Sequence, residues 1–219
     1  MTVADAAESA VKDGSEPKPP GKREQRTIAT RKALIENAER RIAESGLDAL
    51  RARDLAKDAG VALGTIYKYF NDFDELVLRI NSRTLLALSE RLGTAADGVD
   101  DPAERLVALA RAYLGFAEGS PKLWAALFGH RMSGGAPVPE WHLRDHEALF
   151  SLIADPVARL APHLDRQALA VRTRTVFAAV HGVVALSLED RFIGVPRGAL
   201  EAEVESVTRG LVRQLRDGG

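Results

Sequence analysis

The 219-residue chain contains no cysteine. This absence excludes disulfide bonds, a thiolate nucleophile and any metal site with cysteine ligands. The glycine loop that cradles phosphates in nucleotide-binding enzymes is also missing, as is the Gly-x-Ser-x-Gly elbow of hydrolases. We therefore expect a protein that is not an enzyme and that carries no cofactor.

Long hydrophobic runs and strand-like alternation are scarce as well. We find no apolar run that looks long enough to span a bilayer, and the polar N-terminus does not resemble a signal peptide. We therefore expect a cytoplasmic protein that does not bind membranes. Apolar residues recur at helical spacing instead, and prolines fall at the breaks between helical segments, so the predicted fold class is all-α.

Charge is distributed unevenly along a chain whose net charge is −1. Residues 22–71 hold eleven Lys and Arg against seven Asp and Glu, a local balance of about +4. A basic N-terminal part on an acidic remainder favours a DNA-binding head on a larger body. A chance fluctuation of surface charge would give the same imbalance.

Residues 51–70 predict two short helices joined by a tight turn. Ala56 is small enough for a close helix crossing, Gly60 tolerates a positive φ in the turn, and Ile66 is an apolar anchor for the second helix. Such a helix-turn-helix can place its second helix in the major groove of DNA. An ordinary pair of core helices fits the same pattern.

The pattern divides the chain into a disordered tail (1–22), a helix-turn-helix domain (23–73) and a helical body (74–219). The first helix is expected from about Thr27 to Ser45, and Asp72 with Glu75 forms a carboxylate capping box for the fourth helix. Asp101-Pro102 and Ser120-Pro121 each predict an N-cap followed by proline at the first helical position. Body helices are expected at about 102–118, 121–132, 140–160 with a bend near Pro156, 166–192 and 199–216.

The N-terminal third resembles the DNA-binding domain of the tetracycline-repressor (TetR) family. The residues that carry the resemblance are Arg53–Ala56, Ala59–Val61, Gly64–Phe70 and Glu75–Leu76. The resemblance implies an all-α homodimer, with a three-helix helix-turn-helix domain and a C-terminal helical domain for ligand binding and dimerisation. It also implies a transcription regulator, usually a repressor, that a small ligand releases from a palindromic operator.

Carried over position by position, the resemblance nominates DNA-contacting residues. These candidates are Arg26, Thr27, Arg53, Leu63, Gly64, Thr65, Tyr67, Lys68 and Tyr69. The chain departs from many family members by having Leu63 where a polar or basic residue is common, and Asn71 and Phe73 where lysine is common. We expect Leu63 to contact a thymine methyl group, and we expect one phosphate contact fewer.

The aromatic and aliphatic residues of the body suit an apolar ligand pocket between helices. The candidates for a mostly apolar effector are Phe116, Trp124, Leu127, Phe128, Trp141, Phe150, Phe177 and His181. A plain hydrophobic core is the simpler interpretation of any one of them. For His181, a histidine with its hydrogen bonds satisfied in the core is the alternative.

His142 and His146 are one helical turn apart and share a helix face, as metal ligands do. A third ligand would have to come from His130 or a carboxylate. A polar helix face is the simpler interpretation, so we expect no metal site.

The last two helices are expected to form a homodimer through the apolar stripes Val176, Val180, Val184 and Leu188, and Leu200, Val204, Val207, Leu211 and Leu215. The expected partners are thus double-stranded DNA, a second copy of the chain and a small apolar effector. The alternative function is a helical binding or adaptor protein that does not regulate DNA.

Overall fold

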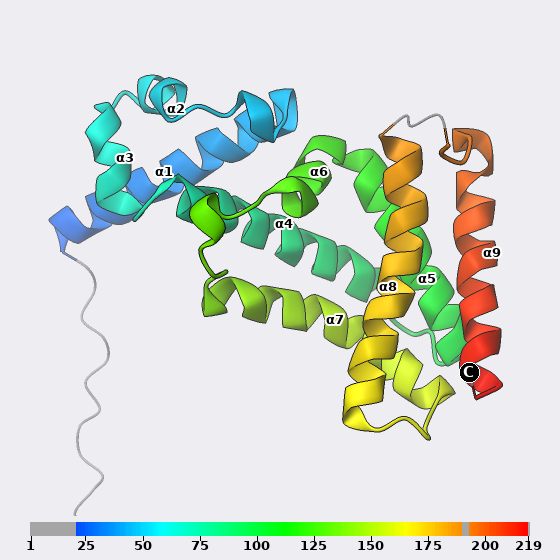
Figure 1. Ribbon diagram of the computed structural model, residues 1–219. Coiled ribbons are helices and arrows are strands. Elements are labelled where there is room, and N and C mark those ends of the chain that lie inside the picture. Colours follow the sequence, from blue (N-terminus) through cyan, green and yellow to red (C-terminus); the bar gives the residue numbers. More distant parts are fainter. Residues whose placement is uncertain (1–20, 190–192, 219) are drawn as a thin grey trace, which may run out of the picture.

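The computed structural model describes residues 21–189 and 193–218, and these residues form nine α-helices and two short 3-10 turns without a strand (Figure 1). The all-α prediction is therefore confirmed. The predicted tail lies almost wholly outside the described residues. Helix α1 (Lys22–Ser45) begins five residues before the predicted start at Thr27. The sequence between Gly21 and Gly46 contains no residue that breaks a helix, and the Thr27 and Thr30 hydroxyls bond to helix carbonyls four residues back.

The head consists of α1, the 3-10 turn η1 (Leu47–Ala49), α2 (Ala52–Asp58) and α3 (Leu63–Tyr69). Its helices pack around one hydrophobic core, to which the first half of α4 (Phe73–Ala96) also contributes. The most deeply buried side chains of this core include Leu34, Ile42, Leu55, Ile66 and Phe70. The head therefore has a core of its own, and it shares α4 with the body.

The turn between α2 and α3 has the backbone geometry that the sequence predicts. Gly60 adopts a φ of 63°, a conformation that favours glycine because it has no Cβ atom. The Val61 N–H donates to the Ala56 carbonyl at 2.9 Å and closes the turn. Ala56 is 3% exposed at the helix crossing, and Ile66 is fully buried. This short turn holds α3 at a fixed angle to α2 and leaves its far side free.

Helix α4 joins the head to the body and contributes residues to both hydrophobic cores. The Asp72 carboxylate caps it by accepting from the Glu75 N–H at 2.7 Å. Glu75 reaches back to the Asn71 N–H at 3.0 Å, one residue earlier than in a standard capping box. Figure 1 shows α4 running from beneath the head to the far end of the body.

The body adds α5 (Pro102–Gly119), α6 (Pro121–Gly129), α7 (Glu140–Leu160), α8 (Arg166–Leu188) and α9 (Arg197–Arg216), with the 3-10 turn η2 (Ser133–Gly135) before α7. Asp101 caps α5 as predicted, since its carboxylate accepts from the Ala103 and Glu104 N–H groups. Ser120 is the N-cap of α6 and Pro121 its first residue, as predicted, although the Ser120 hydroxyl forms no capping hydrogen bond. Helix α6 ends at Gly129 instead of Met132, and α7 continues as one helix through Pro156.

Helix α8 contradicts the expectation that no segment is apolar enough to span a bilayer. By length and composition alone it qualifies, with a mean hydropathy of 1.4 over its most apolar window. Only 22% of that window is buried within the protein. Arg172 and Arg174 interrupt its alanines and valines, so the segment did not read as a continuous apolar run in the sequence. One apolar helix of this kind is weak evidence for a membrane segment, and its uncovered face requires another explanation.

Candidate nucleic-acid interface and body cavity

Helix α3 presents one face to the outside while Ile66 fixes the other in the core. Leu63 is 42% exposed and Tyr67 is 52% exposed, and both are large apolar or aromatic side chains. Gly64 and Lys68 are also exposed on this helix. The result is an outward surface that combines an aromatic ring, a hydroxyl, a leucine and an ammonium group. Such a surface can contact base edges and phosphates at the same time.

The remaining candidates differ in how much of each side chain is accessible. Arg26, Thr27 and Arg53 are exposed. Thr65 is half-buried, and Tyr69 is half-buried because its ring packs against the head core. The Tyr69 ring therefore stabilises the position of α3. The sequence pattern alone could not distinguish this packing role from a contact with phosphate.

A chain of charged and aromatic side chains connects the head to α7 through the first turns of α4. The Glu75 carboxylate lies 3.5 Å from the Arg31 guanidinium of α1 and 3.2 Å from the Arg79 guanidinium. Arg79 in turn lies over the ring of Trp141, with its Cζ atom 3.8 Å from the ring centroid. Trp141, a predicted ligand residue, therefore contacts the helix that supports the head.

The charge state of Glu75 suits this bridging position. Burial acts to raise the pKa of its carboxyl group, but the hydrogen bonds from the Asn71 N–H and from Arg79 outweigh burial and lower that pKa. Glu75 is therefore ionised at neutral pH and pairs with both arginines.

The loop that precedes α7 and the helix α6 make further contacts with the head and with α4. The Asp74 carboxylate accepts from the Ser133 N–H at 2.8 Å, which fixes this loop to the first turn of α4. Lys122 of α6 donates to the Glu44 carbonyl near the end of α1. Ala126 of α6 is buried in the core of the head. The head is therefore joined to the body through α6 as well as through α4.

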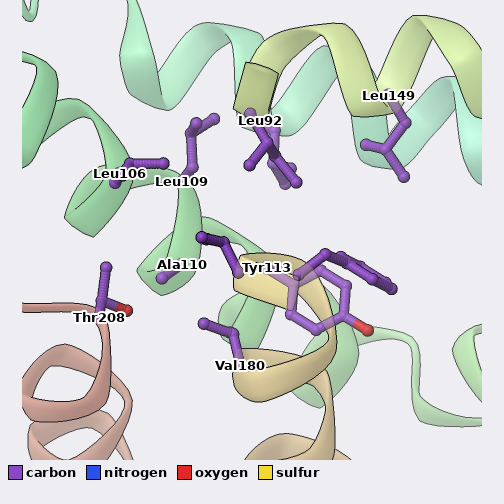
Figure 2. A pocket seen from close by; sticks show the side chains of 11 residues that line it. Leu92, Leu106, Leu109, Ala110, Tyr113, Leu149, Val180 and Thr208 are labelled. Carbon is purple, nitrogen blue, oxygen red and sulfur yellow. The ribbon is translucent and has the colours of Figure 1, made fainter. Parts of the chain in front are cut away.

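The body contains a small apolar cavity of about 30 Å³ between α4, α5, α7, α8 and α9 (Figure 2). Leucines from three of these helices meet there with Val180 of α8, while Thr208 of α9 is a polar residue at its edge. Its volume is enough for one or two water molecules only. The full set of lining residues is Leu92, Leu106, Leu109, Ala110, Tyr113, Leu149, Ile153, Val176, Phe177, Val180 and Thr208.

A chain of two hydrogen bonds lies beside this cavity. The Trp124 indole N–H donates to the Tyr113 oxygen at 2.9 Å, and that oxygen lies 2.7 Å from Nδ1 of His181. Because the indole can only donate, we assign the phenol proton to the bond with His181, whose own proton is then on Nε2. Burial lowers the pKa of His181 and raises that of Tyr113, so both groups are neutral. His181 thus has a partner at Nδ1 within an aromatic core.

The predicted ligand residues separate into several places in the structure. Trp124, Phe128, Phe177 and His181 form one aromatic cluster around Tyr113, and Phe150 packs against Phe177. Among the eight candidates, Phe177 alone lines the small apolar cavity. The cavity-lining residues that sequence reasoning did not nominate include Tyr113 and Ala110 of α5. Their apolar spacing along α5 marked them as buried but gave no sign of a cavity.

The candidates outside this cluster occupy different surroundings. Phe116 is buried in the body core, and Leu127 lines an open cavity beside the loop before α7. Phe150 is also exposed to a groove between α7 and α8.

The stripes proposed for dimer contact are already used within one chain. Val176, Val180, Val184, Leu200 and Val204 are buried in the body core, so that assignment is wrong. A second face of each helix is free instead. On α8 it includes Val171, 59% exposed, Ala178 and Leu186, 40% exposed; on α9 it includes Ala202 and Ser206. In Figure 1, α8 and α9 lie side by side at the end of the body opposite α3.

Two family models match the chain. The model for bacterial regulatory proteins of the tetR family matches residues 34–80, and the model for the tetracyclin repressor-like C-terminal domain matches residues 106–211. An HTH-type transcriptional regulator of Mycobacterium tuberculosis is 27% identical over 124 residues, which are 56% of this chain and 50% of that protein. The chain therefore spans about half the length of the curated relatives it matches.

Solved structures share the arrangement of the helices over most of the chain. A protein of unknown function from Rhodococcus sp. RHA1 has a TM-score of 0.67 and 25% identity, and the match covers 92% of this chain and 100% of that one. The fatty acid degradation regulator FadR of Bacillus halodurans has a TM-score of 0.60 and 22% identity, covering 92% of this chain and 99% of that one. At 22% identity the likeness concerns the fold alone.

Proposed function

The chain belongs to the TetR family of bacterial regulatory proteins, and on that basis we propose that it is a ligand-responsive transcription regulator, not an enzyme, that acts as a repressor. It binds a palindromic operator in the cytoplasm as a homodimer, and a small apolar effector releases it. Residues 23–73 form the DNA-binding domain in this proposal, and residues 74–219 form the domain that binds the effector and the second copy.

One observation carries the DNA-binding proposal: the outward face of α3. Buried Ile66 fixes the helix, while Tyr67 and Lys68 are exposed on the surface. We assign base contacts to Leu63, Gly64, Thr65 and Tyr67, and phosphate contacts to Arg26, Thr27, Arg53, Lys68 and Tyr69. A fluorescently labelled palindrome from upstream of the gene should bind purified protein more tightly than a scrambled duplex does. Equal affinity for both duplexes would contradict the proposal.

The substitution Lys68→Ala should weaken binding to every duplex sequence by a similar factor. When one phosphate contact is lost, DNA binding releases about one counterion fewer. The slope of log affinity against log salt should therefore become shallower by about one. Binding would be measured by fluorescence anisotropy at several salt concentrations. Arg144→Ala, which removes an exposed cation from the body, is the control and should keep the wild-type slope. A change of sequence preference with an unchanged slope would show that Lys68 contacts bases instead.

The exposed faces of α8 and α9 support the homodimer. Only 22% of the most apolar window of α8 is buried within one chain. Covering this apolar surface with a second copy would stabilise the helix. Small residues such as Ala178, Gly182 and Ala202 allow two helices to approach closely. Two helices from each chain would then form a four-helix interface with the same face of both copies in contact.

The small volume of the apolar cavity supports a release mechanism. An effector of drug size needs a pocket about ten times larger than 30 Å³, so its binding must separate the helices around the cavity. Those helices include α4, which supports the head, and α7, which carries Trp141. A ligand that binds the widened state more tightly than the closed state shifts the population toward it. The spacing of the two heads, about 34–36 Å for adjacent major grooves, would then be lost.

Filling the cavity with the substitution Ala110→Leu should reduce the response to the effector by about tenfold or more. The added carbons occupy the space that the effector must enter, and overpacking costs about 1–3 kcal/mol. Operator release would be titrated with the apolar compounds that release the wild-type protein. Operator affinity without effector should stay within about threefold of wild type.

The control is Ala108→Leu, the same change on an outward position of α5. It should leave the response unchanged. If Ala110→Leu removed operator binding and effector response together, the cavity would be a structural part of the core.

A further inference from the structure

His142 and His146 of α7 direct their outer nitrogens toward each other. The two Nε2 atoms are 3.3 Å apart, and the ring centroids are 4.9 Å apart. His142 is 4% exposed, while His146 is half-buried one turn further along the helix.

The distance between the two nitrogens matches one edge of a tetrahedral metal site. With Zn–N bonds of about 2.0–2.1 Å, two imidazole nitrogens lie about 3.3–3.4 Å apart and the ring centroids about 5.2 Å apart. Two rings pointing straight at each other in a simple hydrogen bond of the same length would have centroids about 5.6 Å apart. The observed centroid distance of 4.9 Å is shorter than both values, so the two rings are inclined to the line that joins their nitrogens.

The surroundings of His142 prepare it as a ligand. Its Nδ1 atom lies 2.8 Å from the Ser82 hydroxyl of α4, which can accept the Nδ1 proton and leave the Nε2 lone pair free. Metal-bound histidines commonly have such a partner on the second nitrogen, because it fixes the tautomer and the ring orientation.

An open cavity of about 530 Å³ borders the pair, and buried polar atoms without hydrogen bonds line it. Asn81 is 1% exposed, and its amide nitrogen donates to the Ala126 carbonyl, but its Oδ1 atom has no hydrogen-bond partner among the described residues. Nε2 of His130 also lacks a hydrogen bond there, although it lies 3.4 Å from the Asp74 carboxylate. Because an unsatisfied buried acceptor is costly, the Asn81 oxygen indicates a bound water or ion.

We propose that Nε2 of His142 and Nε2 of His146 bind a divalent transition-metal ion of the Zn²⁺ class at the mouth of this cavity. Within residues 21–189 and 193–218, no group of three or more His, Cys, Asp or Glu side chains could hold a metal. The remaining coordination positions therefore go to water or to the Asn81 amide oxygen. Such a partly open site exchanges its ion, unlike a closed structural zinc site. Both histidines belong to α7 and Asn81 belongs to α4, so an ion that also binds the Asn81 oxygen would join the two helices.

The test uses tag-free, metal-stripped full-length protein titrated with Zn²⁺ by calorimetry and with Co²⁺ by visible absorption. The wild-type protein should bind one ion per chain, Co²⁺ should give the absorption bands of a site with imidazole ligands, and saturating Zn²⁺ should raise Tm. His146→Gln should weaken binding at least tenfold while leaving the metal-free Tm close to wild type. His142→Gln should also weaken binding at least tenfold.

The matched control is His163→Gln, which removes an exposed histidine from the turn after α7. It should leave stoichiometry and affinity unchanged. The proposal is overturned if wild-type protein and His146→Gln bind Zn²⁺ equally, or if wild-type protein binds none at 100-fold excess. The pair would then be a hydrogen bond between two neutral imidazoles.

Discussion

Replacing both Val171 and Leu186 with glutamate should convert the protein into a monomer and lower its affinity for a palindromic operator by about 10²–10⁴-fold. Both residues are exposed on the free face of α8. In a dimer each would be covered by the partner, where an unpaired carboxylate is strongly unfavourable. A monomer loses the second half-site, and the joint binding of two sites accounts for a factor of this size.

Sedimentation at micromolar concentration would measure the change of assembly, and fluorescence anisotropy would measure operator binding. Leu86→Glu is the control, since Leu86 is 52% exposed on α4, away from α8 and α9. It should remain dimeric. A double variant that stays dimeric would show that another surface joins the two copies.

Replacing Tyr67 with alanine should lower operator affinity by about 10–100-fold, equivalent to about 1–3 kcal/mol. The side chain is 52% exposed in the outward face of α3, so its removal leaves the head core intact. Tm should therefore stay close to the wild-type value. Leu86 has the same exposed fraction as Tyr67, so Leu86→Ala is the matched control for operator affinity and for Tm.

Tyr67→Phe separates the two ways in which the ring can contribute. If the hydroxyl donates to a base or a phosphate, the phenylalanine variant will bind about as weakly as the alanine variant. If the ring packs on a thymine methyl group, the phenylalanine variant will bind almost as tightly as wild type. Wild-type affinity in Tyr67→Ala would mean that α3 does not contact DNA.

The head was predictable because its constraints are local. The spacing from Ala56 to Gly60 and Ile66 predicts a positive φ in the turn and two buried residues where the helices cross, and the structure has both. Asp72 and Glu75 signalled the start of α4 through cap chemistry that involves neighbouring residues only. The start of α1 was missed because the polar residues from Lys22 to Arg26 lack an apolar stripe, although nothing in them opposes a helix.

The body was predictable as helices but not as a site. Aromatic residues were nominated by residue type alone. The structure places Trp124 in a hydrogen bond with Tyr113, Phe116 in the body core and Trp141 beneath Arg79. The inward face of α8 could not be read from the pattern, because both of its faces carry small or apolar residues. On α9 the apolar stripe was recognised, but the structure packs it into the body of the same chain. His142 and His146 were correctly placed on one helix face, but the distance between their nitrogens depends on rotamers that Ser82 and the surrounding packing select.

The sequence by itself determined the helical class, the helix-turn-helix and its cap, because short-range spacing and backbone preference act within a few residues. Tertiary structure alone decided what the body can bind and which surface is left for a partner. The small cavity, the Tyr113–His181 hydrogen bond and the ion pair between Arg31 and Glu75 join residues far apart in the chain. Their positions follow from how the helices of the head and the body pack, and packing depends on complementary shapes that no local pattern encodes.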